Sequence, residues 1–319
     1  MENMDFLTEK AVLVTGGAGF IGSWLSQELL RLGARVSILD IKERPPLSKA
    51  DYIQGDVRDQ ALVKSILQEK NIRTIFHLAA QAIVGEALKA PAEALDTNVK
   101  GTWNVLESVR LFKNDCSVIV ASSDKAYGSH SVLPYKEDFA LLGENPYDCS
   151  KNCADRIAQM YAKIYKLPVA VTRCGNVYGG GDLNFSRLIP DTIRSVFYDK
   201  PPQIRSDGLY QRDYVFIKDI VSAYLCMAEA LNKKNLGGEA FNFGNNKPLK
   251  AIEVVNNIIA YMGKPHLKPV ILANAQYEIK DQYLDAGKAM KMFGWTPRFS
   301  FEQGIGETIG WYENFFKKI

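Results

Sequence analysis

The first half of the chain alternates short apolar runs with longer amphipathic stretches. Helical spacing of apolar positions extends up to residue 32 and recurs over 57–70, 92–112 and 146–165. The apolar runs between these stretches have the length and β-branched content of buried strands, at 11–14, 35–39, 52–53, 74–79, 117–121 and 168–173. This order predicts strand–helix–strand units and hence an α/β fold, a doubly wound parallel sheet covered by helices on both faces.

The pattern changes beyond residue 174. Strands are expected at 212–215 and 239–243 with a helix at 218–231 between them, and further helices are expected at 249–262, 283–293 and 301–316. We expect residues 1–174 to form a sheet domain to which 212–245 return, and residues 175–211 and 246–319 to form a smaller lobe. Trp295 and Trp311 are expected in the core of that lobe, because large aromatic residues are most often packed inside.

A glycine-rich turn, TGGAGFIG, connects the first predicted strand to the first helix. Its glycines permit a tight turn, close approach of the main chain to a pyrophosphate and close packing of helix on strand. The helix that follows presents free N–H groups to the phosphates. The fold is therefore predicted to be of the Rossmann type. We expect the dinucleotide to be bound by Gly16, Gly19, Phe20, Ile21 and Gly22.

The end of the second predicted strand indicates which dinucleotide is bound. Asp40 terminates this strand, and a carboxylate there accepts hydrogen bonds from the adenosine ribose and repels a 2′-phosphate. NAD is therefore the expected cofactor, although Lys42 nearby favours NADP. Further cofactor contacts are expected where later strands end, from Asp56, Val57, Leu78, Ala79 and Ala80.

The segment 122–151 gathers most of the reactive side chains. A hydroxyl, a carboxylate and an amine stand in a row at Ser123, Asp124 and Lys125, directly after the predicted strand 117–121. Ligands of open parallel sheets bind at the carboxyl ends of the strands, so this row is expected in the active site. The alternative for Asp124 and Lys125 is a solvated turn without a catalytic role.

Tyr147 and Lys151 are spaced four apart in a predicted helix that begins near Pro146. Residues with this spacing share one face of a helix, and a cation beside a phenol lowers the pKa of the phenol. We therefore expect Tyr147 to act as a base toward a hydroxyl group. The alternative is an ordinary amphipathic helix, since two residues at this spacing are common.

Composition and charge exclude several classes of protein. The net charge of +3 arises from 39 basic and 36 acidic residues without a basic tract, so no nucleic-acid partner is expected. No apolar run reaches the ~18 residues of a membrane span, and the N-terminus lacks the order of a signal peptide. Five cysteines without paired spacing and only three histidines favour a soluble, reduced, cytoplasmic protein without a metal site.

Six motifs together resemble the extended branch of the short-chain dehydrogenase/reductases, which act on nucleotide sugars. They are TGGAGFIG, HLAAQ, NVKGTWNVLE, YxxxK, GNVYGGG and RDYVFIKDI, and the similarity covers essentially the whole chain. Within this branch, SSDKAYG and GNVYGGGDLNFSRLIPDTIR resemble the CDP-glucose 4,6-dehydratases. The branch's epimerases carry a small apolar residue at the position of Asp124, and its dTDP-glucose dehydratases carry Glu at that of Lys125. Ile21, Gly85 and Glu86 replace basic residues of the CDP-glucose pattern, so the nucleotide base stays open.

The resemblance implies a nucleotide-diphosphate hexose as substrate, with CDP-glucose favoured, and a reaction in which NAD is not consumed. Tyr147 takes the proton of the 4-hydroxyl while the C4 hydride passes to NAD, and Ser123 holds the 4-oxygen. Lys125 then removes the C5 proton, Asp124 protonates the departing 6-hydroxyl, and hydride returns to C6. Lys125 needs a lowered pKa and Asp124 a raised one. Whether Asp124 is protonated through burial or by sharing a proton with Lys125 stays open.

Further roles follow from the same resemblance. Asn176, Arg187 and Arg212 are expected to bind the substrate, the arginines through its diphosphate, although a surface salt bridge is as good an interpretation of Arg187. Asn98 is expected near the cofactor, where it fixes its helix or the active-site main chain. A homodimer is expected through the helices at 98–112 and 146–165. A 4-epimerase, a decarboxylase and an idle dinucleotide-binding regulator remain as alternatives.

Overall fold

A seven-stranded parallel sheet forms the centre of the larger part of the molecule. The structure is a computed structural model, and it describes residues 5–43, 49–112, 115–233, 236–275 and 278–318. The strand order is β11-β6-β5-β4-β1-β2-β3, and every neighbouring pair is parallel. The strands are β1 (Ala11–Thr15), β2 (Arg35–Asp40), β3 (Asp51–Gln54), β4 (Thr74–His77), β5 (Ser117–Ala121), β6 (Val169–Cys174) and β11 (Ala240–Phe243). The predicted doubly wound, Rossmann-type sheet is therefore confirmed.

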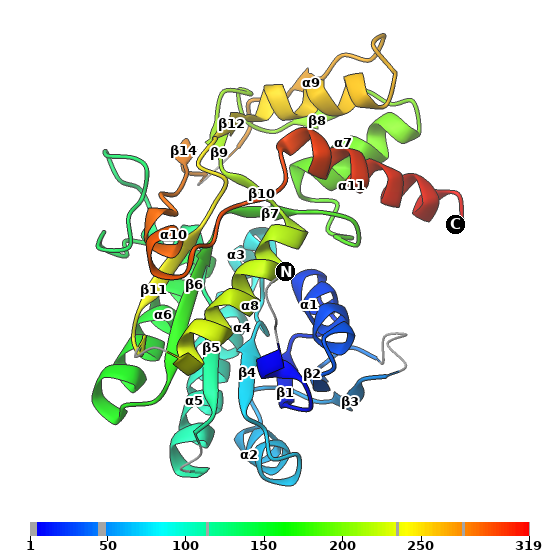
Figure 1. The fold of residues 1–319 in the computed structure, drawn as a ribbon. Helices are drawn as coiled ribbons and strands as arrows, with labels where there is room; N and C mark the ends of the chain where they lie inside the picture. The colour runs from blue at the N-terminus through cyan, green and yellow to red at the C-terminus, as the bar shows by residue number, and fades with distance from the viewer. Residues whose placement is uncertain (1–4, 44–48, 113–114, 234–235, 276–277, 319) are drawn as a thin grey trace.

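Helices cover both faces of this sheet (Figure 1). On one face α1 (Phe20–Arg31) and α8 (Ile217–Lys233) pack against each other, and on the other lie α2 (Gln60–Glu69), α5 (Gly101–Phe112) and α6 (Pro146–Tyr165). Short elements complete this part, namely η1 (Asp5–Leu7), α3 (Val84–Lys89), α4 (Pro91–Leu95), the π-helical turn η2 (Asp96–Lys100) and the 3-10 turn η3 (Asp124–Tyr127). Among the described residues, no helix is both long and apolar enough to span a membrane.

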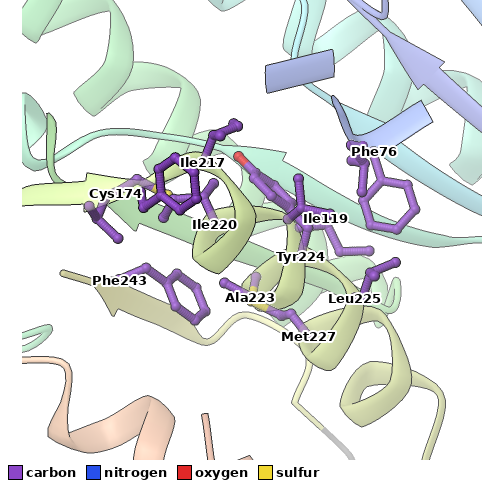
Figure 2. Close-up of a cluster of buried hydrophobic side chains, with 14 of the residues drawn as sticks. Phe76, Ile119, Cys174, Ile217, Ile220, Ala223, Tyr224, Leu225, Met227 and Phe243 are labelled. Atoms are coloured by element: carbon purple, nitrogen blue, oxygen red, sulfur yellow. The ribbon is translucent and has the colours of Figure 1, made fainter. Parts of the chain in front are cut away.

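The core beneath α8 joins this helix to the sheet (Figure 2). Tyr224 is 1% exposed, lies edge-on to Phe76 of β4 and exchanges a hydrogen bond of 3.1 Å with Thr172 of β6. Ile220 and Met227 on the same helix are fully buried against the sheet. Burial of side chains of this size contributes roughly 1.5–3 kcal/mol each, so α8 is firmly fixed on the strands that carry the active site.

A smaller lobe lies beyond the carboxyl ends of the strands (Figure 1). Its helices are α7 (Leu188–Phe197), α9 (Ala251–Tyr261) and α11 (Phe301–Phe316). Its short strands form three small sheets from β7 (Asn176–Tyr178) with β10 (Tyr214–Phe216), β9 (Gln211–Arg212) with β12 (Leu249–Lys250) and β14 (Asp281–Gln282), and β8 (Gln203–Ile204) with β13 (Val270–Ile271). The helix α10 (Gly287–Phe293) returns to pack against β11 of the large sheet.

Three predicted boundaries are wrong, each for a local reason. The helix predicted at 57–70 begins only at Gln60, because the Asp59 side chain caps it by accepting from the N–H of Leu62. The helix predicted at 92–112 is interrupted by the π-helical turn η2. The helix predicted at 283–293 begins at Gly287, because Leu284 forms a β-bridge with Tyr135 and residues 281–282 pair with β9.

The expected strand at 212–215 is divided into β9 and β10, which belong to two different small sheets. Asp213 between them is fully buried, and its carboxylate accepts from the main-chain N–H of Asn245 at 2.6 Å. Within the described part of 212–245, α8 packs against the large sheet and β11 joins it. We therefore propose that the chain returns to the sheet domain at Ile217 rather than at residue 212.

Candidate active site

The glycine-rich turn between β1 and α1 has the shape that a bound pyrophosphate requires. Gly16 has φ of +71°, and a Cβ there would lie 2.7 Å from the main-chain nitrogen of Ala79. A Cβ on Gly22 would overlap the main-chain oxygen of Gly16. Gly19 precedes α1 and leaves the N-terminus of this helix without a side-chain cap, next to Phe20 and Ile21. The turn thus offers free N–H groups and the positive end of a helix to an anion, which fits a dinucleotide.

Asp40 lies at the end of β2 and is tied to this turn. Its carboxylate accepts hydrogen bonds from the N–H of Ala18 at 2.9 Å and from the N–H of Lys42 at 3.0 Å. A carboxylate oxygen accepts more than one hydrogen bond, so ribose hydroxyls can still bind to it, whereas its charge repels a phosphate. The amide rather than the amine of Lys42 contacts Asp40, which removes one argument for NADP.

The other expected cofactor residues lie along the same edge of the sheet. Asp56 is half-exposed and pairs with Arg58 at 2.6 Å, which lowers the pKa of its carboxyl group. An adenine would therefore meet an ion pair here rather than an isolated carboxylate. Val57 is buried next to it, and Leu78, Ala79 and Ala80 follow β4 directly.

The side chain of Asn98 links the segment after β4 to α6 by hydrogen bonds. Its side-chain oxygen accepts from the N–H of Gln81 at 2.7 Å, and its side-chain amide donates to Ser150 of α6 at 2.8 Å. It is 1% exposed and so holds the segment after β4 against the helix that carries Tyr147. His77 is buried nearby, and burial together with the Lys151 charge lowers its pKa to about 3. His77 is therefore a neutral packing residue that hydrogen-bonds Thr15.

Tyr147 and Lys151 are both buried on the inner face of α6, as their spacing predicts. The Lys151 ammonium donates to the main-chain oxygen of Ala121, at the end of β5, over 2.9 Å, and burial lowers its pKa to about 8. Burial also raises the pKa of Tyr147 to about 12, against the opposing effects of a Ser123 hydrogen bond and the Arg187 charge. The predicted lowering of the Tyr147 pKa is wrong in direction, because desolvation outweighs the neighbouring cations.

The row Ser123, Asp124 and Lys125 opens the 3-10 turn η3 directly after β5. The hydroxyl of Ser123 donates to Asp124 at 3.1 Å and accepts from the N–H of Lys125 at 3.2 Å. Asp124 is 1% exposed, so the alternative of a solvated turn does not hold for it. The Lys125 amine donates to the side-chain oxygen of Gln282, and burial lowers its pKa, in the direction that a base requires.

Asp148 is a buried carboxyl group that the sequence analysis missed. It follows Tyr147 on α6, is 2% exposed and accepts a hydrogen bond from the Asn145 side-chain amide at 2.7 Å. Burial raises its pKa to about 7, although the Lys125 charge opposes that effect. Its only sequence signal is an acidic residue in the first turn of a helix, which predicts an exposed cap.

The expected substrate residues lie where the lobe faces this row. Arg187 precedes α7, pairs with Asp182 at 2.8 Å and lies near enough to Tyr147 to lower its pKa. Arg212 is 9% exposed, and its guanidinium donates to the main-chain oxygens of Gln211, Ile279 and Lys280. It therefore holds β14 beside Lys125, which is a structural role, and its binding to the diphosphate stays a prediction. Asn176 begins β7 next to Arg212 and Asp213 in the lobe.

The glycine turn 179–181, part of the GNVYGGG motif, lies against large side chains of other elements. A Cβ on Gly180 would overlap the ring of Trp311, and the main-chain oxygen of Gly180 accepts from the Trp24 indole at 2.8 Å. Gly180 therefore makes room for Trp311, and a Cβ on Gly179 would overlap Ile217 of α8 in the same way. Trp295 is 3% exposed, as expected of a core residue.

A cavity of about 320 Å³ adjoins the start of α6. It is lined by Leu88, Gly128, Ser129, Glu144, Asn145, Pro146, Asp148 and Ile279. Elements of both the sheet domain and the lobe contribute to it, as is usual for ligand sites between domains. Within the described parts of the chain, no group of three or more His, Cys, Asp or Glu side chains is arranged to hold a metal ion.

Comparisons with known proteins agree with this geometry. A sequence profile of the family described as GDP-mannose 4,6 dehydratase matches residues 13–308. The CDP-glucose 4,6-dehydratase of Salmonella typhimurium is 31% identical, over 98% of this chain and 93% of its own length. The crystal structure of dTDP-glucose 4,6-dehydratase from Bacillus anthracis in complex with NAD superposes with a TM-score of 0.82, at 30% identity over 96% of this chain and 97% of that one. The UDP-glucose 4-epimerase of Thermotoga maritima with UDP-glucose gives 0.89, at 27% identity over 96% and 99%.

Proposed function

The chain belongs to the GDP-mannose 4,6-dehydratase family of nucleotide-sugar dehydratases and epimerases, and we propose that it acts as a 4,6-dehydratase of CDP-glucose. One observation carries this proposal. Asp124, a candidate acid, is buried and Lys125, a candidate base, is half-buried beside it, and Ser123 links Asp124 to Tyr147 of the Tyr147–Lys151 pair. A 4-epimerase needs only the tyrosine and the cofactor, whereas loss of water needs this second acid and base.

NAD is the cofactor, and when bound it accepts the hydride of C4 and later returns it to C6. Gly16, Gly19 and Gly22 form the cradle for its pyrophosphate, and Asp40 binds the ribose hydroxyls. In the first step Tyr147 takes the proton of the 4-hydroxyl. Because burial keeps the Tyr147 pKa high, the Ser123 hydrogen bond and the Arg187 charge are what stabilise the phenolate as it forms.

In the second step the C5 proton passes to Lys125, and Asp124 gives a proton to the departing 6-hydroxyl. Burial lowers the pKa of Lys125, so a neutral amine is available at neutral pH to a greater extent than for an exposed lysine. The product is the 4-keto-6-deoxy sugar nucleotide. Arg187 and Asn176 lie on the lobe side of the site, where we propose that they bind the diphosphate and the sugar.

A 4-epimerase is the second candidate. The superposition on the Thermotoga maritima epimerase, with a TM-score of 0.89, is better than the 0.82 found for the Bacillus anthracis dehydratase. Overall shape therefore favours an epimerase, while the second acid and base favour a dehydratase. We prefer the dehydratase because function depends on the site rather than on the fold.

Mass analysis separates the candidates. The purified protein is incubated with CDP-, UDP-, GDP- and dTDP-glucose, and each product is weighed. A dehydratase forms a product lighter by one water, and CDP-glucose is expected to give the highest kcat/KM. An epimerase leaves the mass unchanged and converts glucose to galactose, and unchanged substrate in all four reactions would exclude both activities.

We also propose that the protein forms a homodimer through α5 and α6. Both helices expose large apolar side chains away from the sheet, at Trp103, Leu111, Met160, Ile164 and Tyr165. Trp103, Leu111 and Met160 border a hollow of about 480 Å³ between the two helices. A contiguous apolar patch of this kind marks an interaction surface. The cysteines are free thiols, which fits the reducing cytoplasm that we propose as its compartment.

A further inference from the structure

We propose that Asp148 is a third ionisable group of the elimination site and supplies the proton that Asp124 needs in each catalytic cycle. This inference rests on the proposed dehydratase function and assigns a role to a carboxyl group that this function leaves unused. Asp148 acts through Asp124, so it is a proton-supplying residue rather than one that touches the sugar.

The two oxygens of Asp148 differ in their surroundings. Oδ2 accepts from the Asn145 amide, while the N–H of Asp148 donates to the Asn145 side chain at 3.0 Å, a reciprocal cap of α6. Oδ1 is fully buried and has no hydrogen-bond partner. The cap therefore explains one oxygen only. A cap without further function would leave its carboxylate in water, because burying an unpartnered polar atom costs roughly 1–3 kcal/mol.

Two residues that interact with the Lys125 amine also have buried polar atoms without a hydrogen-bond partner. Oδ2 of Asp124 and the side-chain nitrogen of Gln282 are buried without a partner, and both residues are 1% exposed. Gln282 binds the Lys125 amine through its oxygen, and Asp124 and Asp148 both interact with the Lys125 charge. Asp148 and Asp124 thus each keep one buried oxygen without a partner, and both carboxyl groups interact with the Lys125 charge. Buried polar atoms without a partner are rare in folded proteins and mark this pair for a function.

The proton balance of the reaction leaves Asp124 one proton short, and Asp148 is a group that can replace this proton. C4 oxidation leaves a proton on Tyr147. In the elimination, the C5 proton moves to Lys125 and the C6–O bond breaks. The 6-hydroxyl then leaves as water with a proton from Asp124. Hydride then returns to C6, and Lys125 returns its proton to C5. At the end Tyr147 holds one proton more and Asp124 one fewer, so Tyr147 must release its proton to water and Asp124 must be reloaded. Asp148 borders the cavity of about 320 Å³, where its own proton is replaced from water.

The charges around Asp148 make it able to hold that proton. From η3, Lys125 lowers and Asp124 raises its pKa, and burial dominates, so that Asp148 titrates near pH 7. Tyr147 and Tyr135 also feel its charge. Three further sets of charged groups lie around this part of the site. Glu144 borders the cavity, and Arg212 and Glu278 of the lobe interact with the Lys125 charge. On α3, Glu86 and Lys89 form an ion pair with each other.

The test compares Asp148→Asn with the wild type. Asparagine keeps the acceptor for the Asn145 amide but holds no exchangeable acid proton. Absorbance of bound NADH reports C4 oxidation, and mass spectrometry reports water loss, each as a function of pH. In the wild type we expect water loss to slow as the pH rises through about 7. In Asp148→Asn we expect C4 oxidation at the wild-type rate, water loss about 10²-fold slower, and no change of that rate near pH 7.

Asn145→Ala is the matched second variant. It keeps the Asp148 carboxyl group but removes the hydrogen bond that lowers its pKa, so the pH at which water loss slows should move upward. A structural role would instead lower the melting temperature of both variants and leave the pH profile of water loss in place. If Asp148→Asn does not fold, the profile of Asn145→Ala alone decides, and an unmoved profile overturns the inference.

The outcomes for Asp148 and for the dehydratase differ. A wild-type rate and pH profile of water loss in Asp148→Asn overturns the role of Asp148 and leaves the dehydratase intact. Loss of C4 oxidation together with water loss also overturns it, because Asp148 would then only hold Tyr147 in place. A wild-type enzyme that removes water from none of the four nucleotide glucoses overturns the proposed function and this inference with it.

Discussion

The amine of Lys125 donates a hydrogen bond to the side-chain oxygen of Gln282, a residue 157 positions further along the chain. Lys125 lies at the end of a central strand of the large sheet, whereas Gln282 belongs to β14 of the lobe. Arg212 fixes β14 by donating to the main-chain oxygens of Ile279 and Lys280. The position of the lobe thus determines the surroundings of the candidate base.

Gln282→Leu should slow water loss more than C4 oxidation. Leucine has a similar volume but no acceptor, so Lys125 loses the partner that orients its amine, and we expect about a tenfold decrease in water loss. Gln282→Glu keeps the acceptor and adds a negative charge, which raises the pKa of Lys125 and moves the pH at which the base becomes active upward. Stopped-flow absorbance of bound NADH and mass analysis separate the two steps. Equal slowing of both steps by Gln282→Leu would argue against this role.

Lys125→Ala and Tyr147→Phe should stop the reaction at different points. Without Tyr147 no proton leaves the 4-hydroxyl, so no bound NADH should form. Without Lys125 the sugar should still be oxidised at C4, and bound NADH should accumulate while the C5 hydrogen fails to exchange with deuterated water. Each loss is expected to be ~10²–10⁴-fold in its own step. If Lys125→Ala retained full water loss, the amine would not be the base.

The sequence predicts well those features that depend on neighbours along the chain. The periodic apolar pattern and Pro146 at its start predict α6, and the observed helix Pro146–Tyr165 has the predicted bounds. The position of Ser123, Asp124 and Lys125 after β5 follows from strand order in the same way. These features need only local propensity and the rule that ligands bind at the carboxyl ends of parallel strands.

Features that depend on burial could not be predicted. The pKa of Tyr147 is raised rather than lowered, because its desolvation depends on everything packed around α6. Gln282 reaches Lys125 only because residues 281–282 pair with β9, where the sequence predicts no strand. Asp148 has the sequence signal of an exposed helix cap, and only the packing of η3 against α6 makes it a buried acid.

Gly22→Ala should abolish dinucleotide binding. Its Cβ would overlap the main-chain oxygen of Gly16, so the turn must shift away from the geometry that cradles a pyrophosphate. Gly306→Ala is the matched control, because Gly306 is also inside a helix but has open space around it. Since alanine favours helix over glycine by about 1 kcal/mol, the control should be slightly stabilised with unchanged affinity. Calorimetric titration with NAD decides, and an affinity of Gly22→Ala within twofold of the wild type would contradict the assignment.

Charges placed on the exposed face of α5 and α6 should separate the proposed dimer. Ile164 is 61% exposed and Trp103 is 43% exposed, and a double change to Asp at these two positions would bury two carboxylates in the interface. We expect light scattering to change from a dimer to a monomer at micromolar concentration. The control is Ile41→Asp, since Ile41 is 66% exposed but lies after β2, away from both helices. A wild-type monomer would contradict the proposed interface.

Asp148 should also make the stability of the protein depend on pH, independently of any reaction. Its carboxyl group has a pKa of about 7 in the folded protein, compared with 3.8 in an unfolded chain. Between these values the folded state keeps a proton that the unfolded state has lost, so stability is fully present below pH 4 and decreases as the pH rises through 7. A difference of roughly three pKa units corresponds to about 4 kcal/mol at most.

Asp148→Asn removes this titration. The free energy of unfolding of the variant relative to the wild type should therefore rise between pH 4 and pH 8, and the variant should become the more stable protein at the alkaline end. Urea unfolding at both pH values measures the difference. Asp191→Asn is the control, because Asp191 also lies in the first turn of a helix but is hydrated and paired with Arg194 at 2.5 Å, and it should show no comparable rise. If the two variants responded equally to pH, Asp148 would not be protonated near neutrality, and it could not supply a proton to Asp124.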